Sequence, residues 1–218
     1  MRNTQGAPTH DVKVSERSPT RQGTRERILD AAALVVATRG LAHATTKEIA
    51  RAAKLSEAAL YKYFRDKDEL VLLLMFERLP QWLGVLTELL ARVGKRSVVA
   101  NLEAVVYQAI LFYADFVPMA SSLFAEPDIL VKHQKRLHRD NIGVQHANAA
   151  VAEYIRGEQR AERIARTVDP DAASALVLGG AFQRAFLRRY LGLAIEEKAE
   201  RTFAKQLVRT LATTLLAE

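Results

Sequence analysis

The segment from Thr45 to Phe64, TTKEIARAAKLSEAALYKYF, contains two short helical patterns separated by only a few residues. Thr45 and Glu48 have the spacing of a capping box, which predicts that the first helix begins there. Ser56 is a favourable N-cap for the second helix. The spacing therefore predicts two helices joined by a tight turn. The residues predicted to face inward and set the angle between the two helices are Ile49, Leu55, Leu60 and Phe64.

Helical periodicity continues on both sides of this segment. A preceding helix is predicted from Thr24, where apolar residues recur every three or four positions. Asp66 and Glu69 form a second capping box that opens the next helix. Pro80 predicts a kink or a new helix, and Pro118 predicts a break. The later segments with helical periodicity are 70–79, 98–116, 128–156, 169–191 and 195–216.

No segment shows a strand pattern or an internal repeat. The fold is therefore predicted to be all-α, with an N-terminal three-helix helix-turn-helix domain in residues 23–69. A C-terminal domain of about six helices is predicted in residues 70–218. Residues 1–22 are polar and bury little apolar surface, which predicts a flexible arm.

The composition limits the classes of function. A net charge of +7 favours an anionic partner such as nucleic acid. The chain contains no cysteine, which excludes disulfides, cysteine-ligated zinc and thiol catalysis. The longest uncharged runs, 104–114 and 172–183, are shorter than the roughly 18 residues that span a bilayer. These features predict a cytoplasmic protein without a membrane partner.

Two short helices joined by a tight turn suit the major groove of DNA, which is about 12 Å wide and admits one α-helix. The first helix would lie on the backbone while the second presents side chains to base edges. Ala58 and Ala59 are small enough to allow close approach, and hydroxyl groups suit phosphate oxygens. The residues predicted to contact DNA are Thr45, Thr46, Lys47, Lys54, Ser56, Glu57, Ala58, Ala59, Tyr61, Lys62, Tyr63 and Lys67.

The segment TTKEIARAAKLSEAALYKYFRDKDEL, preceded by TRERILDAAALVVATRG, resembles the DNA-binding domain of the tetracycline-repressor (TetR) family. The resemblance covers approximately Thr24 to Leu70. It implies a two-fold dimer on a palindromic double-stranded DNA operator, released by a small-molecule effector.

Two residues in this segment are unusual for the family. Lys54 stands in the turn where the family usually has glycine, and a positive φ there would cost a non-glycine residue roughly 1 kcal/mol. It is either a harmless strained substitution or a phosphate contact. Glu57 either accepts a hydrogen bond from a cytosine amino group or stabilises the start of its helix through the dipole.

The resemblance implies that the last two helices form most of the dimer interface. Residues 171–190 are apolar on nearly every face, which predicts burial on two sides. Gly179 and Gly180 would permit close approach of a second backbone. The residues predicted for the dimer interface are Ala175, Leu176, Gly179, Gly180, Phe186, Phe203, Leu207, Leu211 and Leu215.

The resemblance also implies an effector pocket among the middle helices, where the composition favours a largely apolar ligand. Aromatic residues at helical spacing also form ordinary cores, so each residue fits both roles. The candidate pocket residues are Trp82, Leu86, Tyr107, Gln108, Ile110, Phe112, Tyr113, Phe116, Met119, Phe124, His133, Gln134, Asn148, Phe182 and Gln183.

Enzymatic function is disfavoured by the spacing of the polar residues. His133 and His138 are five positions apart, whereas paired metal ligands on one helix are four apart. No catalytic residue, metal site or cofactor is therefore predicted. The predicted function is a ligand-responsive homodimeric repressor. The alternatives are a ligand-independent architectural or activating DNA-binding protein, and an all-helical carrier or enzyme that retains the N-terminal unit.

Overall fold

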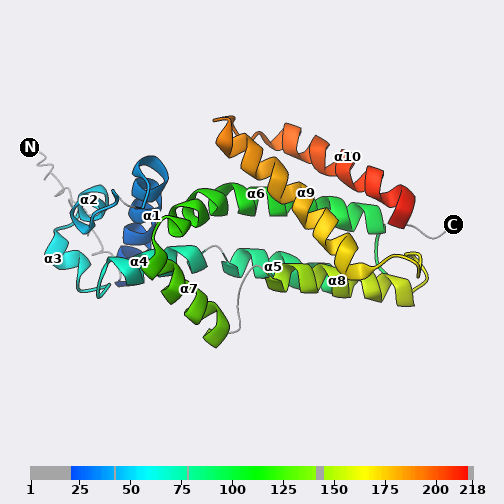
Figure 1. Ribbon diagram of the computed structural model, residues 1–218, viewed down its shortest axis with the longest axis horizontal. Coiled ribbons are helices and arrows are strands. Elements are labelled where there is room, and N and C mark those ends of the chain that lie inside the picture. The colour runs from blue at the N-terminus through cyan, green and yellow to red at the C-terminus, as the bar shows by residue number, and fades with distance from the viewer. Residues whose placement is uncertain (1–20, 42, 78, 141–144, 216–218) are drawn as a thin grey trace, which may run out of the picture.

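The computed structural model describes residues 21–41, 43–77, 79–140 and 145–215, and over these residues it confirms the all-α prediction (Figure 1). The helices are α1 (Arg21–Arg39), α2 (Thr46–Ala52), α3 (Glu57–Leu60), α4 (Lys67–Glu77), α5 (Leu79–Leu90), α6 (Val98–Phe124), α7 (Pro127–Asp140), α8 (Gln145–Arg160), α9 (Pro170–Tyr190) and α10 (Glu197–Leu215). The predicted arm, residues 1–22, lies outside the described residues except for the last two positions, which belong to α1.

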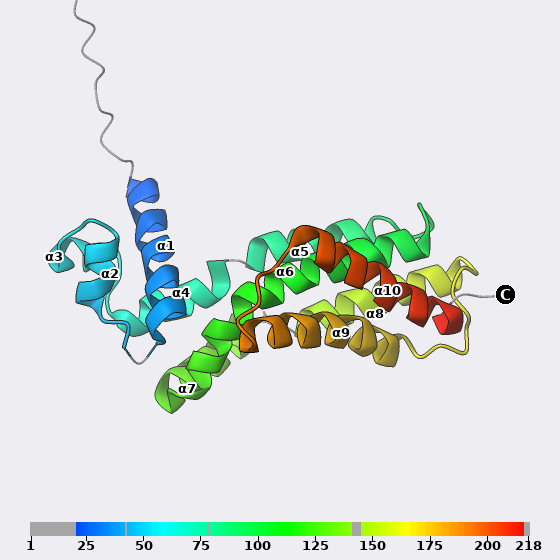
Figure 2. The same cartoon turned by 90° about the horizontal axis from the view of Figure 1, so that it is seen from above.

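The helices form two groups along the long axis of the molecule. Helices α1 to α4 gather at one end, and α5, α6, α8, α9 and α10 form an elongated bundle at the other (Figures 1 and 2). The N-terminal group has its own core, in which Ile28, Ile49, Leu60 and Phe64 are almost completely buried. The predicted helix-turn-helix thus packs on α1 and α4 and leaves α3 at the outer end.

Helix α6 is the central helix of the larger bundle. By length and composition it could also cross a membrane. Here it packs against α5, α9 and α10, and buries residues such as Leu102, Val106 and Ile110. The apolar residues of α6 are therefore buried inside the bundle, as expected for the core helix of a helical domain.

The prediction that Pro118 breaks a helix is wrong, because α6 continues through it to Phe124. A proline inside a helix removes the backbone donor that would bond the carbonyl four residues earlier. That carbonyl belongs to Ala114, and Arg189 at the end of α9 donates its Nε–H to it at 2.7 Å. A side chain from another helix thus replaces the hydrogen bond that Pro118 cannot make.

The prediction of one helix across residues 128–156 is also wrong. Helix α7 ends at Asp140 and α8 begins at Gln145. The sequence between them contains Gly143, and glycine has a low helix propensity. Pro80 behaves as predicted, since α4 ends at Glu77 and a new helix, α5, begins at Leu79.

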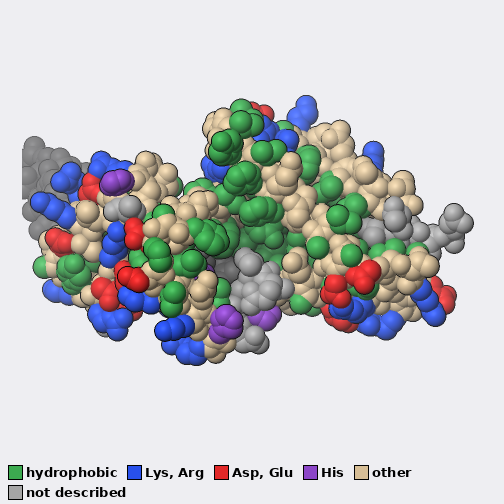
Figure 3. All heavy atoms as spheres, viewed as in Figure 1, with side chains coloured by type: hydrophobic (Ala, Val, Ile, Leu, Met, Phe, Trp, Pro, Cys, Tyr) green, Lys and Arg blue, Asp and Glu red, His purple; other side chains and the backbone are tan. Residues whose placement is uncertain are grey.

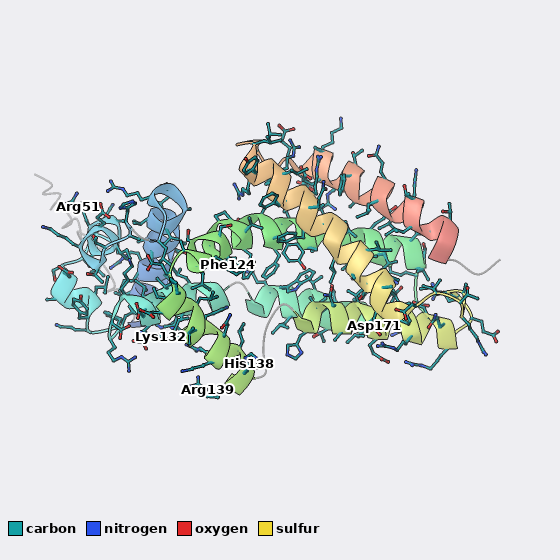
Figure 4. All side chains as sticks on the ribbon, in the orientation of Figure 1. Arg51, Phe124, Lys132, His138, Arg139 and Asp171 are labelled. Atoms are coloured by element: carbon teal, nitrogen blue, oxygen red, sulfur yellow. The ribbon has the colours of Figure 1, made fainter. Side chains whose placement is uncertain are left out.

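The two cores meet at the C-terminal end of α6. Leu123 of α6 and Ile129 of α7 belong to the N-terminal core, although both helices come after α5 of the larger bundle in the sequence. Phe116 packs against both cores. Lys132 of α7 forms an ion pair with Asp68 in the first turn of α4 (Figure 4). The end of α6 and α7 therefore join the N-terminal helices to the larger bundle.

Helices α9 and α10 are held together by a buried carboxylate. The side chain of Glu200 is completely buried and accepts a hydrogen bond from Arg184 Nε at 2.8 Å and another from Arg188 Nε at 2.9 Å. The Arg184 guanidinium also lies 4.8 Å from the centre of the Phe203 ring. A buried charge is tolerated only when it is paired and hydrogen-bonded, and Glu200 meets both conditions.

Candidate nucleic-acid interface and cavities

The helix-turn-helix is built from local capping interactions. The Glu48 amide donates to Thr45 Oγ1 at 3.2 Å, and the Ala59 amide donates to Ser56 Oγ at 3.2 Å. In the second predicted capping box, the Glu69 amide donates to Asp66 Oδ1 at 2.7 Å. This hydrogen bond holds the pKa of Asp66 below its usual range. Each helix therefore begins at the predicted capping residue.

The turn between α2 and α3 is a Schellman motif with lysine in the left-handed position. Lys54 has a φ of 57°, and its amide donates to Arg51 O at 3.0 Å. The Leu55 amide donates to Ala50 O at 2.8 Å, which completes the motif. The positive φ predicted for this residue is confirmed, and the Lys54 side chain is exposed.

Lys54→Gly should raise the free energy of unfolding by roughly 1 kcal/mol, because glycine adopts a left-handed φ without a Cβ clash. Urea denaturation followed by circular dichroism measures the change. Lys62→Gly is the matched control and should lower stability, because Lys62 is not among the positive-φ residues. Equal effects of the two substitutions would contradict the strain at Lys54.

Three side chains connect the outward surfaces of α2 and α3. The Thr46 hydroxyl donates to the Glu57 carboxylate, and Tyr61 Oη donates to Thr46 Oγ1 at 3.3 Å. Glu57 is therefore half-buried against α2, an arrangement that neither of its two predicted roles includes. The contact fixes the position of a negative charge beside Tyr61, whose ring is about half exposed.

The predicted DNA-contacting residues lie mainly on one outer surface. Those that are exposed are Thr45, Lys47, Lys54, Ser56, Ala58, Tyr61 and Lys62, whereas Thr46, Glu57, Ala59, Tyr63 and Lys67 are half-buried. Lys67 Nζ donates to Leu41 O at 2.7 Å, so its amine holds the connection between α1 and α2.

A basic hollow beside α2 was not predicted from the sequence. Its volume is about 690 Å³, and it is lined by Arg39, His43, Thr45, Lys47, Glu48 and Arg51. Arg51 lies at the outer end of the N-terminal group (Figure 4). Arg51 follows Lys47 by four positions, a spacing that puts both side chains on one face of a helix. This spacing could have indicated the basic hollow from the sequence.

One cavity, here called the α8–α9 cavity, lies between α6, α8 and α9. Its volume is about 410 Å³, and it is lined by Tyr113, Phe116, Asn148, Ala175, Leu178, Gly179 and Phe182. Four of these seven residues are candidate pocket residues from the sequence. Burial raises the pKa of Tyr113 to about 12, so its phenol is neutral at physiological pH. The walls are mostly apolar.

A second cavity, here called the α5–α6 cavity, is lined mainly by residues of α5, α6 and the end of α9. Its volume is about 330 Å³, and it is lined by Gln81, Trp82, Val85, Gln108, Leu111, Phe112, Ala114, Asp115, Arg189 and Ile195. Trp82, Gln108 and Phe112 were predicted for the pocket. Asp115 and Arg189 were not, because their pairing depends on how α6 and α9 meet.

The other candidate pocket residues line neither cavity. Leu86, Tyr107 and Ile110 are buried in the larger core, and Met119 packs against the N-terminal core. Phe124 is 73% exposed, and Gln134 and Gln183 are also exposed. His133 is buried in α7, and desolvation lowers its pKa. The structure therefore places seven of the fifteen candidates at a cavity, four at the α8–α9 cavity and three at the α5–α6 cavity.

The predicted interface residues divide between two environments. Leu176, Gly179 and Phe186 are exposed on α9, and hydrophobic side chains gather over α9 and the adjoining part of α6 (Figure 3). Phe203, Leu207 and Leu211 on α10 instead pack against the core of their own chain. A Cβ on Gly180 would lie 2.6 Å from Leu207, so the close approach at Gly180 is within the chain. The side chain of Leu215 lies outside the described residues.

The sequence matches the family model described as "Bacterial regulatory proteins, tetR family" over residues 28–74. This range contains α2 and α3 and most of α1 and α4, which pack around them. No curated protein sequence matches the chain.

The fold is similar to several solved structures. A protein of Mesorhizobium loti assigned to the TetR family of transcriptional regulators has a TM-score of 0.71 at 17% identity, covering 91% of this chain and 100% of that chain. SmeT, the repressor of the Stenotrophomonas maltophilia multidrug efflux pump SmeDEF, has a TM-score of 0.62 at 19% identity, covering 89% and 91%. The transcriptional regulator FadR of Bacillus subtilis, solved with stearoyl-CoA, has a TM-score of 0.65 at 17% identity, covering 84% and 96%.

Proposed function

We propose that this chain, whose residues 28–74 match the model of the tetR family of bacterial regulatory proteins, is a homodimeric repressor that binds a palindromic operator through α2 and α3. The observation that carries the proposal is the position of α3. This helix lies at the outer end of the molecule, and α2 braces it through the Schellman turn and the Thr46–Glu57 contact. A helix held this way is available to the major groove.

Operator recognition is proposed to combine phosphate and base contacts. Lys47, Arg51 and Lys54 are exposed cations near the bracing helix, where they would contact backbone phosphates. Ala58, Tyr61 and Lys62 are exposed on or just after α3, where they would reach base edges or the adjoining phosphates. The hydrogen bond from Thr46 holds the Glu57 carboxylate in place. This negative charge disfavours DNA phosphates close to Glu57 and would therefore contribute to the choice of operator sequence.

Tyr61→Ala should weaken operator binding by roughly 1–3 kcal/mol, because it removes a ring at the groove-facing surface and a hydroxyl bound to Thr46. The operator is first selected from random DNA duplexes with the wild-type protein, and fluorescence anisotropy then gives affinities at one fixed salt concentration. Tyr61→Phe is the matched control for the hydroxyl alone and should lose less. An unchanged affinity for Tyr61→Ala would show that α3 is oriented differently on DNA.

The proposed dimer interface is the outward face of α9. The rings of Phe182, Phe186 and Tyr190 stack in sequence, with centroid distances of 6.3 and 5.8 Å. Leu176 is 60% exposed and Tyr190 is 77% exposed. A continuous apolar surface of this kind marks a protein interaction site. A second copy of the chain that covers it would place two α3 helices on half-sites related by two-fold symmetry.

The α8–α9 cavity is the proposed effector site for a small, largely apolar molecule. It adjoins the proposed dimer face through Gly179 and Phe182, and it contains Phe116, which packs against both cores. A ligand that displaces Phe116 would alter the junction of α6 with the N-terminal helices. For such a ligand to release DNA, it must bind the released conformation more tightly than the DNA-bound one.

Two observations would separate this proposal from the alternatives. Apolar small molecules that co-purify with the chain would favour an effector-responsive repressor over a ligand-independent DNA-binding protein. DNA binding that weakens steeply with salt would disfavour a carrier or enzyme that merely retains the N-terminal unit.

A further inference from the structure

We propose that the α5–α6 cavity is a second ligand site, separate from the proposed effector site, for a planar aromatic acid. The proposal goes beyond operator binding and effector release, because it concerns a different cavity with different chemistry. Trp82 and Phe112 line this cavity and contact Tyr113 and Phe116, which line the proposed effector site.

The walls of the α5–α6 cavity suit a flat ring. Trp82 and Phe112 stack with a centroid distance of 5.3 Å and an interplanar angle of 12°. Phe112 in turn stacks on Phe116 at 5.5 Å and 16°. A volume of about 330 Å³ lies at the lower end of the range for small-molecule sites. A planar ligand would extend this parallel stack, and aromatic pairs favour such offset arrangements.

The polar end of the cavity is held in place by the fold. Arg189 donates its Nε–H to Ala114 O at 2.7 Å, which is the carbonyl that Pro118 leaves without a helical partner. Its Nη2 group lies 3.4 Å from Asp115 Oδ1. A guanidinium carries five N–H donors, so Arg189 keeps donors beyond these two contacts. The cation is thus positioned at the cavity before any ligand binds.

The donors in this cavity favour a ligand that carries hydrogen-bond acceptors. The buried indole N–H of Trp82 has no hydrogen-bond partner among the described residues. Gln81 and Gln108 add amide donors at the cavity wall. Asp115 opposes an anion, but Arg189 lies beside it and offsets its charge. A carboxylate attached to a flat ring satisfies Arg189 and places the ring against Trp82 and Phe112.

Trp82 is the single tryptophan of the chain and therefore reports directly on this cavity. The test titrates the full-length protein with sodium benzoate at constant ionic strength and follows Trp82 fluorescence. Benzylamine carries the same ring with a positive charge, and cyclohexanecarboxylate carries the same charge on a non-planar ring. We expect a saturable change with benzoate that is stronger than with either analogue.

Four variants locate the site. Arg189→Met should weaken benzoate binding by roughly tenfold to a hundredfold, as expected for the loss of a hydrogen bond to a charged group. Asp115→Asn should strengthen it, because a neighbouring negative charge is removed. Asn148→Leu alters the α8–α9 cavity, and Arg209→Met removes an exposed cation of α10. Both of these controls should bind benzoate as the wild type does.

Arg189→Met also removes the donor to Ala114, so thermal unfolding must show that the variant is folded. If Arg189→Met is unfolded, the Asp115→Asn variant and the two analogues test whether the α5–α6 cavity binds benzoate. The proposal is overturned if benzoate gives no saturable change, if benzylamine or cyclohexanecarboxylate binds as tightly, or if Asp115→Asn weakens binding. A loss of benzoate binding in Asn148→Leu would move the site to the α8–α9 cavity.

Discussion

Glu200→Ala should lower the free energy of unfolding by about 3 kcal/mol or more, because it leaves two largely buried arginines without their shared carboxylate. The Glu200 side chain is completely buried, and those of Arg184 and Arg188 are 28% and 17% exposed. Urea denaturation at fixed protein concentration, followed by circular dichroism, measures the loss. The concentration is fixed because a dimer's stability depends on it.

Glu197→Ala is the matched control, since Glu197 lies one turn earlier in α10 and pairs with Arg201 on the surface. An exposed pair of this kind contributes about 0–1 kcal/mol. Glu200→Gln should fall between the two alanine variants, because its amide oxygen still accepts one of the arginine hydrogen bonds. Similar stability for Glu200→Ala and Glu197→Ala would show that the buried network does not hold α9 against α10.

Phe186→Glu should convert the proposed dimer into a monomer and reduce operator affinity. Phe186 lies between Phe182 and Tyr190 in the stacked face of α9. In a dimer across this face, the substitution would bury two carboxylates without partners, which costs several kcal/mol. Size-exclusion chromatography with light scattering measures the mass, and anisotropy measures binding to the selected operator.

Leu34→Glu is the control for Phe186→Glu, because Leu34 is an exposed apolar residue on α1, far from α9 in the structure. This variant should remain dimeric. A dimeric Phe186→Glu protein would place the interface elsewhere. A monomeric wild-type protein would remove the dimer from the proposed function while leaving the helix-turn-helix intact.

The N-terminal domain was largely predictable from the sequence because its signals are local. Capping at Thr45, Ser56 and Asp66 depends on residues three positions apart, and the structure contains each of these hydrogen bonds. The left-handed turn at Lys54 was indicated by the resemblance to a family that usually has glycine at this position, and Lys54 has a φ of 57°. Interactions over a few residues are visible in a linear sequence, and they determined where these helices begin and end.

The direction in which each apolar helix face points, toward the chain's own core or outward, was not predictable from such local signals. Residues of α9 and α10 show apolar periodicity, but the sequence does not show which face meets the chain's own core. In the structure the stripe of α10 faces inward, at Leu207 and Leu211, and Phe186 on α9 faces outward. Tertiary packing decided this, because burial depends on helices that are distant in the sequence.

Sequence patterns were enough to predict the all-α class and the helix-turn-helix, and seven of the twelve residues predicted to contact DNA are exposed in the structure. The continuation of α6 through Pro118 depends on contacts between distant helices, because the donor that replaces the missing hydrogen bond, Arg189, is 75 positions from Ala114. The same contact brings Arg189 to Asp115 and forms the polar end of the α5–α6 cavity. A backbone group without a local partner must find one elsewhere in the fold, and no pattern within a single helix reveals where.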